Sequence, residues 1–323
     1  MEYVTLTDGT DHVRISRLIM GCEPLGGVDW GRMNVADVRE AVARSLDLGV
    51  TTFDTADVYG LGESERALGT VLGKRARDVV IITKGGVNWR CAADQRATTF
   101  ADLSPAHVTR AVDASLRRLG VDSIPLYFLH RPDPSTPLAD TLEALVRCRE
   151  AGKIRLIGVS NFPVPLVRAA LTHTRIAAVQ AQYNLVDRSA EDALIPACRA
   201  LELPVLAYGA LAQGMLGGQY RADAQFGEDD RRHRLPHFAD AARRTSFGVV
   251  RQAADVARSI GRTPAQVSIR WVLDQPGVAA AIVGAKHPKQ AEDNAASADW
   301  GLGERARRQL VRPYPPSDRK VAV

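Results

Sequence analysis

Four titratable side chains stand at or just beyond the ends of three successive apolar runs. Asp54 closes the β-branched run that begins the segment FDTADVYG, and Tyr59 comes five residues later. Lys84 follows the run VVIIT, and His130 follows LYFL. A phenol beside an ammonium group is suited to give a proton to a carbonyl oxygen, because the cation stabilises the phenolate that develops.

In this set Asp54 would keep Lys84 charged and oriented, and His130 would orient and polarise the carbonyl. None of the four is a reductant or a strong nucleophile, so a carbonyl reduced here must take its hydride from a cofactor. A Schiff-base role for Lys84 is the alternative. Such a lysine needs a lowered pKa, whereas a paired Asp54 would raise it.

The elements that must position these residues alternate along the chain. A hairpin signal at Asp8-Gly9 separates two short β-branched runs, and strand and helix patterns then follow one another. The predicted strands are 17–20, 51–53, 79–83, 125–129, 154–159, 177–181, 204–207 and 279–283. The predicted helices are 35–48, 64–72, 105–118, 138–150, 164–172, 190–200, 264–274 and 288–298.

This alternation predicts one (β/α)8 TIM barrel spanning residues 1–323, with an N-terminal β-hairpin and long loops after strands 3 and 7, at 86–104 and 209–243. A doubly wound sheet would carry Gly-x-Gly-x-x-Gly after its first strand, and the segment 21–27 lacks that spacing. In a barrel, the carboxyl ends of all strands meet at one mouth, which brings Asp54, Lys84 and His130 together.

Composition excludes several classes of function. The net charge is +5 over 323 residues with no dense basic stripe, which predicts no nucleic-acid partner. The four cysteines have no metal-ligand or disulfide spacing, and no apolar stretch is long enough to span a membrane. Together with the absence of a signal-peptide pattern at residues 1–9, these features predict a cytoplasmic protein that has no membrane contact.

Two features of the 209–243 loop admit a second interpretation. His233 and His237 have the spacing of a helical metal site, but Pro236 argues against a regular helix, so no metal is predicted. Arg231, Arg232 and Arg234 could meet a phosphate. They directly follow Glu228-Asp229-Asp230, however, and are interpreted as a solvated mixed-charge loop.

The motifs around the four residues, FDTADVYG, IITKGG and YFLHRPDP, resemble the catalytic tetrad of the aldo-keto reductase superfamily. The segments GKIRLIGVSNF (152–162), QYN (182–184) and IVGAKHPKQAEDN (282–294) resemble further signatures of that family, and the likeness extends from Arg17 to about Ala296. The resemblance implies an NADP-dependent barrel enzyme that transfers hydride to an aldehyde or ketone. In it Tyr59 would be the general acid, tuned by Lys84 and Asp54.

The resemblance also implies a cofactor site. Ser160, Asn161 and Gln182 would hold the nicotinamide carboxamide, and Tyr208 would stack on the ring. Lys286 and Gln290 could hold a 2′-phosphate, which favours NADPH over NADH, although many members carry Lys and Arg where this chain has Gly284 and Gln290. The remaining predicted cofactor residues are Gly209, Leu211, Gln213 and Gly214 on the pyrophosphate path and Gly284 and Asn294 at the adenosine end.

The substrate is the least determined part of the prediction. Trp30 and Trp89 resemble aromatic residues of the substrate pocket, next to His130, and polar neighbours permit a sugar-like ketone as well as an aromatic aldehyde. Two other functions stay open: a cofactor-binding, redox-sensing regulatory subunit, and an alcohol dehydrogenase working in the oxidative direction. The sequence does not determine the oligomeric state.

Overall fold

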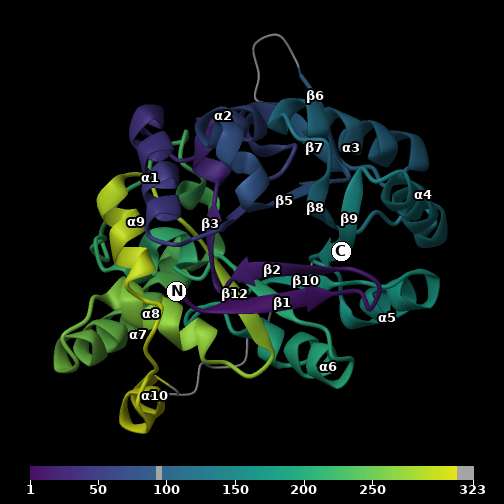
Figure 1. The fold of residues 1–323 in the computed structure, drawn as a ribbon. Helices are drawn as coiled ribbons and strands as arrows, with labels where there is room; N and C mark the ends of the chain where they lie inside the picture. Colours follow the sequence, from purple (N-terminus) through teal and green to yellow (C-terminus); the bar gives the residue numbers. More distant parts are fainter. Residues whose placement is uncertain (92–96, 311–323) are drawn as a thin grey trace.

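Eight parallel strands close into a barrel in the computed structural model, which describes residues 1–91 and 97–310 (Figure 1). Around the barrel the strands follow chain order, and the ring closes where β12 pairs with β3. The predicted barrel and all eight of its strands are confirmed. The strands are β3 (Leu18–Gly21), β4 (Thr52–Asp54), β5 (Val80–Gly85), β8 (Ile124–Leu129), β9 (Ile154–Ser160), β10 (Ala178–Gln182), β11 (Val205–Tyr208) and β12 (Val278–Gly284).

Helices follow the strands and form the outer layer of the barrel. Several begin at side-chain caps; Thr263 and Gln266, for example, form a reciprocal capping box at the start of α8. No helix in the described ranges is long and apolar enough to cross a membrane. The helices are α1 (Val35–Asp47), α2 (Glu63–Leu72), α3 (Pro105–Leu119), α4 (Leu138–Glu150), α5 (Val164–His173), α6 (Leu194–Ala200), α7 (Asp240–Ser259), α8 (Pro264–Leu273), α9 (Pro288–Ala295) and α10 (Glu304–Leu310).

Strict alternation fails after β11, where two helices, α7 and α8, precede β12. The sequence prediction missed α7, which packs against α8 and α10, and it missed α10. The predicted loop after β5 also contains a second hairpin, formed by β6 (Val87–Arg90) and β7 (Thr98–Ala101). The long segments that follow β5 and β11, the third and seventh strands of the barrel, therefore contain secondary structure of their own.

The N-terminal hairpin covers the end of the barrel at which the strands begin (Figure 1). It is formed by β1 (Tyr3–Thr7) and β2 (His12–Ser16), paired antiparallel as predicted. Leu6, Val13 and Ile15 are buried against side chains from inside the barrel, among them Phe128 and Leu206. This apolar contact excludes water from one end of the barrel, and the opposite mouth stays open.

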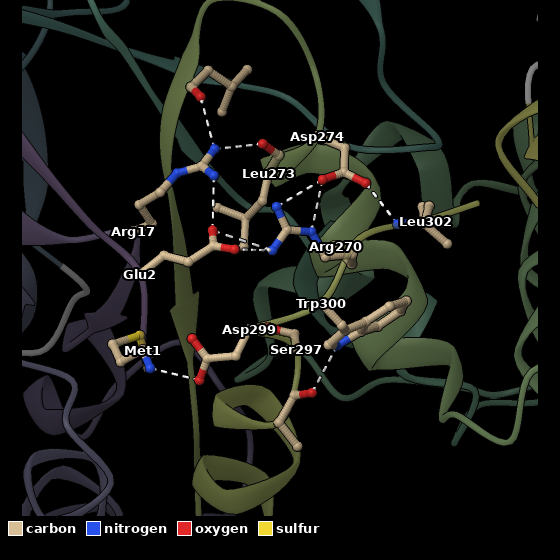
Figure 2. Close-up of polar contacts among 12 residues, drawn as sticks. Met1, Glu2, Arg17, Arg270, Leu273, Asp274, Ser297, Asp299, Trp300 and Leu302 are labelled. Carbon is tan, nitrogen blue, oxygen red and sulfur yellow. Dashed lines mark hydrogen bonds and ion pairs between the residues drawn. The ribbon is translucent and has the colours of Figure 1, made fainter. Parts of the chain in front are cut away.

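Charged groups link several elements near that closed end (Figure 2). Arg270 on α8 pairs with Asp274 at 2.7 Å between Nη2 and Oδ1 and with Glu2 at 3.2 Å. Arg17 also donates to Glu2, at 2.8 Å, and the Met1 amino group lies 2.6 Å from an Asp299 carboxylate oxygen. Each carboxylate in this cluster therefore has a cationic partner.

Candidate active site

A cavity of about 400 Å³ opens at the mouth formed by the carboxyl ends of the strands. All four residues of the predicted tetrad and Trp30 line it, whereas Trp89 lies on β6 and does not. Every predicted cofactor residue lines it as well: Ser160, Asn161, Gln182, Tyr208, Gly209, Leu211, Gln213, Gly214, Gly284, Lys286, Gln290 and Asn294.

A buried ion pair forms the floor of this cavity. Lys84 Nζ, from β5, lies 2.5 Å from Asp54 Oδ1 at the end of β4 and donates to the Thr55 carbonyl at 2.8 Å. Adjacent parallel strands bring the two side chains together, because Asp54 pairs in register with Ile82, two residues before Lys84. Both side chains are almost fully buried, so each charge depends on the other for its compensation.

Gln180 is a part of the site that the sequence prediction missed. Its side-chain Nε2 donates to Asp54 Oδ2 at 2.7 Å, so it holds the carboxylate oxygen that Lys84 leaves free. The other amide atom, Oε1, is buried and has no hydrogen-bond partner among the described residues. An unpaired buried acceptor is costly, which makes this atom a point where a bound ligand would donate a hydrogen bond.

Tyr59 and His130 lie above the ion pair. The Tyr59 ring is 5.2 Å from Lys84 Nζ and meets the His130 ring edge to face, with 5.8 Å between centroids. Burial raises the pKa of Tyr59 well above its usual value, Glu23 and Asp54 raise it further, and Arg231 opposes them. The phenol therefore keeps its proton at neutral pH.

His130 is an uncharged imidazole in this setting. Burial lowers its pKa from 6.5 to about 3, and the positive charges of Lys84 and Arg231 act in the same direction. Its Nδ1 atom is buried without a partner among the described residues. A neutral imidazole donates from one nitrogen only, so His130 can orient a polar ligand without acting as a strong acid.

Two glycines hold the Tyr59 loop against the loop that follows β3. A Cβ atom built on Gly60 would lie 2.3 Å from the Gly26 carbonyl oxygen, and one built on Gly26 would lie 2.8 Å from the Gly60 nitrogen. Gly60 also has a φ of 59°, a conformation that disfavours residues with a side chain. Only glycine at both positions allows the two backbones to approach this closely.

A chain of side chains crosses the mouth above β9 and β11. The Tyr208 hydroxyl donates to Asn161 Oδ1 at 2.6 Å, and Asn161 Nδ2 donates to the His130 carbonyl at 2.9 Å. Asn161 has a φ of 60°, so this position is strained and its geometry is fixed by these contacts. Gln182, which lines the same cavity, instead donates to Asp187 at 3.1 Å.

The segment after β11 is built from unusual backbone conformations. Ala212, Gln213 and Gly214 all have positive φ, at 47°, 52° and 92°. Gln213 also has a buried side-chain oxygen that lacks a partner among the described residues. Consecutive positive φ values are costly for residues with side chains and cluster at ligand clamps, so this segment fits contact with a ligand through its backbone.

The far end of the cavity is organised around Lys286. Its Nζ donates to the Trp30 carbonyl at 2.9 Å, and its backbone nitrogen donates to Gln290 Oε1 at 2.8 Å. Asn294 caps β12 by donating to the Gly284 carbonyl at 3.2 Å. Burial and the nearby Arg232 lower the pKa of Lys286 to about 8. An anion bound next to this ammonium group would therefore favour its charged form.

The prediction that Arg231, Arg232 and Arg234 belong to a solvated mixed-charge loop is wrong for Arg231 and Arg232, whereas Arg234 is exposed. Arg232 is only 5% exposed, and both it and Arg231 line the cavity. Arg231 pairs with Glu23, while Asp230 forms an isolated β-bridge with Trp30. The pairing of Arg231 was missed because Glu23 lies 208 residues earlier in the chain. Arg232, by contrast, is held by its neighbour Asp230 and by Tyr220.

The fold and this site together define a (β/α)8 barrel protein with a phenol, an imidazole and a buried Lys–Asp pair at its mouth. The model of the Aldo/keto reductase family matches residues 17–305. The chain is 32% identical over 314 residues to aldo-keto reductase YhdN of Bacillus subtilis, covering 96% of this chain and 92% of the relative. The chain therefore belongs to the aldo/keto reductase family of oxidoreductases.

Two other relatives extend this comparison. Aldo-keto reductase yakc of Schizosaccharomyces pombe, whose name specifies NADP(+), is 31% identical over 279 residues, which are 85% of this chain and 81% of the relative. The glycerol dehydrogenase of Gluconobacter oxydans has a solved structure that superimposes with a TM-score of 0.87 at 30% identity, covering 97% of this chain and 98% of that one.

Proposed function

We propose that this protein is an NADP(H)-dependent reductase of an aldehyde or ketone, in which Tyr59 is the general acid. The observation that carries this proposal is the position of Tyr59, whose ring lies next to both His130 and the buried Lys84–Asp54 pair in one cavity. A carbonyl oxygen placed between the phenol and the imidazole would meet two hydrogen-bond donors as negative charge develops on it.

Each residue of the tetrad then has a separate task. Tyr59 gives its proton to the carbonyl oxygen, and Lys84 stabilises the phenolate that remains. Asp54 keeps Lys84 charged and fixed, and it is held in turn by Gln180. His130, being neutral, orients the substrate oxygen without competing with Tyr59 as the acid.

The cofactor proposal depends on the atoms that the protein leaves unpaired. Gln180 Oε1 and Gln213 Oε1 are buried acceptors at the mouth, suited to amide or hydroxyl donors of a dinucleotide. Lys286 supports NADPH rather than NADH, because a 2′-phosphate would favour its charged form against burial and the repulsion of Arg232, which Asp230 offsets in part. A bound nicotinamide supplies the hydride, and the residues of the site supply binding and the proton.

The test is oxidation of NADPH, followed by absorbance, with a panel of short aliphatic, hydroxylated and aromatic aldehydes. We expect turnover with at least one of them and a KM for NADPH at least about tenfold below that for NADH. If the cofactor binds, as measured by fluorescence titration, but no carbonyl in the panel is reduced, the protein is a cofactor-binding regulatory subunit instead.

The oxidative direction has one specific observation in its favour. The structural relative from Gluconobacter oxydans is named for the oxidation of an alcohol, and the same residues serve both directions by microscopic reversibility. Assaying NADP⁺ reduction with the matching alcohols measures the two directions on one site. The direction used in the cell then follows from the ratio of reduced to oxidised cofactor.

A further inference from the structure

A second group of buried polar side chains lies behind the loop that carries Tyr59. Glu65 on α2 is fully buried, and its two carboxylate oxygens accept from Thr83 Oγ1 and from Arg118 Nε, each at 2.6 Å. Thr83 directly precedes Lys84 on β5, and Arg118 lies on α3. Glu65, Thr83 and Arg118 therefore tie three elements together, and none of these three residues lines the cavity.

Asp57 is a buried carboxyl group that forms no ion pair within the described residues. It is 1% exposed, and its Oδ1 atom has no hydrogen-bond partner in the same part of the chain. Arg118, the cation on the neighbouring helix, already pairs with Glu65. A carboxylate buried without a paired cation is costly, so the uncharged acid is the favoured form of Asp57.

The balance of charges around Asp57 also favours its uncharged form. Burial raises the pKa of Asp57 well above its usual value, and Glu65 on α2 raises it further. Arg118 on α3, a neighbouring backbone N–H group and Lys84 on β5 oppose this rise. On β8, Tyr127 also faces Asp57; burial raises the pKa of Tyr127, and Asp57 raises it further.

The backbone of Asp57 is bound to Lys84. Its N–H donates to the Lys84 carbonyl at 3.1 Å, and Lys84 Nζ donates in return to the Thr55 carbonyl at 2.8 Å. Tyr59 follows two residues later, and its N–H donates to the Ala56 carbonyl at 3.2 Å. A displacement of Asp57 would therefore move the phenol of Tyr59 relative to the ammonium group of Lys84.

Tyr127 approaches the Lys84–Gly85 peptide from the side of α3. A Cβ atom built on Gly85 would lie 2.0 Å from the Tyr127 hydroxyl oxygen and 3.2 Å from the Cβ atom of Ala111 on α3. The hydroxyl is buried and, like Asp57 Oδ1, has no partner among the described residues. Unlike a carboxylate, an uncharged acid can donate as well as accept a hydrogen bond, so it is compatible with both a phenol and a carboxylate as neighbours.

We propose that Asp57 is a positioning residue, an uncharged carboxylic acid that keeps the Tyr59 loop packed against the Lys84–Gly85 peptide. Asp57 does not touch the substrate and acts only through Tyr59, whose place relative to Lys84 it fixes. The effect on catalysis rests on the proposed carbonyl reduction, whereas the uncharged state and the packing belong to the fold. Misplacing a catalytic group by about 1 Å can cost on the order of 10²-fold in rate.

The first experiment tests the uncharged state through the pH dependence of stability. In an unfolded chain an aspartic acid loses its proton at a pKa of about 3.9, whereas folded Asp57 keeps its proton to a higher pH. The folded state then binds one proton more than the unfolded state, so this group lowers stability as the pH rises. Asp57→Asn is neutral in both states, and its urea midpoint should therefore rise relative to wild type between pH 5 and pH 8.

The matched control for this experiment is Asp122→Asn, which removes an exposed carboxyl group. Its offset from the wild-type urea midpoint should stay constant with pH. Parallel curves for Asp57→Asn and wild type would show that Asp57 is ionised in the folded protein, and would overturn the proposal. The comparison uses only differences with pH, so it needs neither a substrate nor equal stability of the variants.

The second experiment tests the positioning role with two substitutions. Asp57→Ala removes the carboxyl group and should lower kcat for an aldehyde about tenfold, with the affinity for NADPH unchanged because Asp57 does not line the cavity. Asp57→Asn keeps the shape without the charge and should recover kcat to near the wild-type value. A purely structural residue would lower the urea midpoint of Asp57→Ala without changing kcat per folded molecule, and that result would contradict positioning. An Asp57→Asn enzyme as slow as Asp57→Ala would contradict it as well.

An NMR measurement separates the positioning role from the proposed reaction. The ring signal of Tyr59 is identified in protein labelled with ¹³C-tyrosine by its loss in Tyr59→Phe, and it is recorded without substrate. This signal should shift in Asp57→Ala and lie close to its wild-type position in Asp57→Asn. An identical signal in all three proteins would show that Asp57 does not position Tyr59. The expected shifts in a protein that reduces no carbonyl would support the positioning role and overturn only the proposed reaction.

Discussion

The two ends of the barrel use polar groups in opposite ways. At the closed end, Arg270 is 3% exposed and its guanidinium meets carboxylates of both Asp274 and Glu2 (Figure 2). At the open mouth, buried atoms of Trp30, His130 and Gln180 have no partner among the described residues. Polar side-chain atoms are buried at both ends. What differs is whether those atoms have hydrogen-bond or ion-pair partners within the protein.

This difference separates groups that stabilise the fold from groups that are reserved for a ligand. A closed cluster gains little from further binding, since its donors and acceptors are already paired. An incomplete cluster costs stability in the free protein and recovers that cost when a ligand completes it. Substitutions at the closed end should therefore change stability, and substitutions at the mouth should change activity.

Tyr59→Phe tests the mouth and should have the largest effect. Loss of the phenolic hydroxyl removes the proposed acid, so kcat should fall about 10²–10⁴-fold. Affinity for NADPH, measured by fluorescence titration, and the urea midpoint of unfolding should stay close to wild type. An unchanged rate would show that another group delivers the proton.

Arg270→Met tests the closed end. The substitution removes the buried cation that Asp274 and Glu2 share and leaves them the more exposed Arg307 and Arg17 as partners. The free energy of unfolding should therefore fall by about 3 kcal/mol. Urea denaturation followed by circular dichroism measures this as a lower midpoint with the same slope. Activity per folded molecule should not change. A large fall in kcat at full folding would contradict the division between the two ends.

The pH dependence of stability tests His130. Its pKa is lowered to about 3 in the folded protein, whereas the unfolded chain takes up the proton near 6.5. Unfolding therefore binds a proton below that pH, and this group lowers stability progressively as the pH falls from about 6.5 towards 3. His130→Gln should show a flatter decline between pH 7 and pH 4.5 in urea titrations. The exposed His173, changed to Gln, is the control and should retain the wild-type decline.

Glu63→Gln should have the smallest effect of these substitutions on the free energy of unfolding. Its ion pair with Arg66 has a distance of 2.9 Å, but both side chains are more than half exposed. Removing it should change the free energy of unfolding by less than about 0.5 kcal/mol, because water screens the charges. A loss as large as that of Arg270→Met would mean that pairing alone, without burial, determines the contribution of these charges.

The barrel could be predicted from the sequence because its strands are short apolar runs that end in polar residues. That pattern predicted all eight strands and placed the tetrad at one mouth. The helix α7 was missed although its buried residues Val250, Ala253 and Val256 recur with helical spacing. Its arginine-rich start follows a charge run, and α8 already supplied the one helix expected in that unit.

The site could be predicted only as far as local spacing reaches. Gln180 and Gln182 lie two residues apart on one strand, so their side chains point to the same face of it. Which of them reaches Asp54 depends on how far along the barrel axis each one lies, and this is Gln180. The Glu23–Arg231 pair joins residues 208 positions apart. No local pattern indicates such a pair, because it depends on how two loops meet above the finished barrel.

The contact between Gly26 and Gly60 has a consequence for directed evolution of the enzyme. The turn that carries Glu23 and Trp30 is joined through these glycines to the loop that carries Tyr59. A library that randomises the whole turn would move Tyr59, the proposed acid, as it varied the pocket, and we expect most of its members to be inactive. A library that keeps Gly26 and Gly60 and varies the positions around them would explore new substrates while retaining the chemistry.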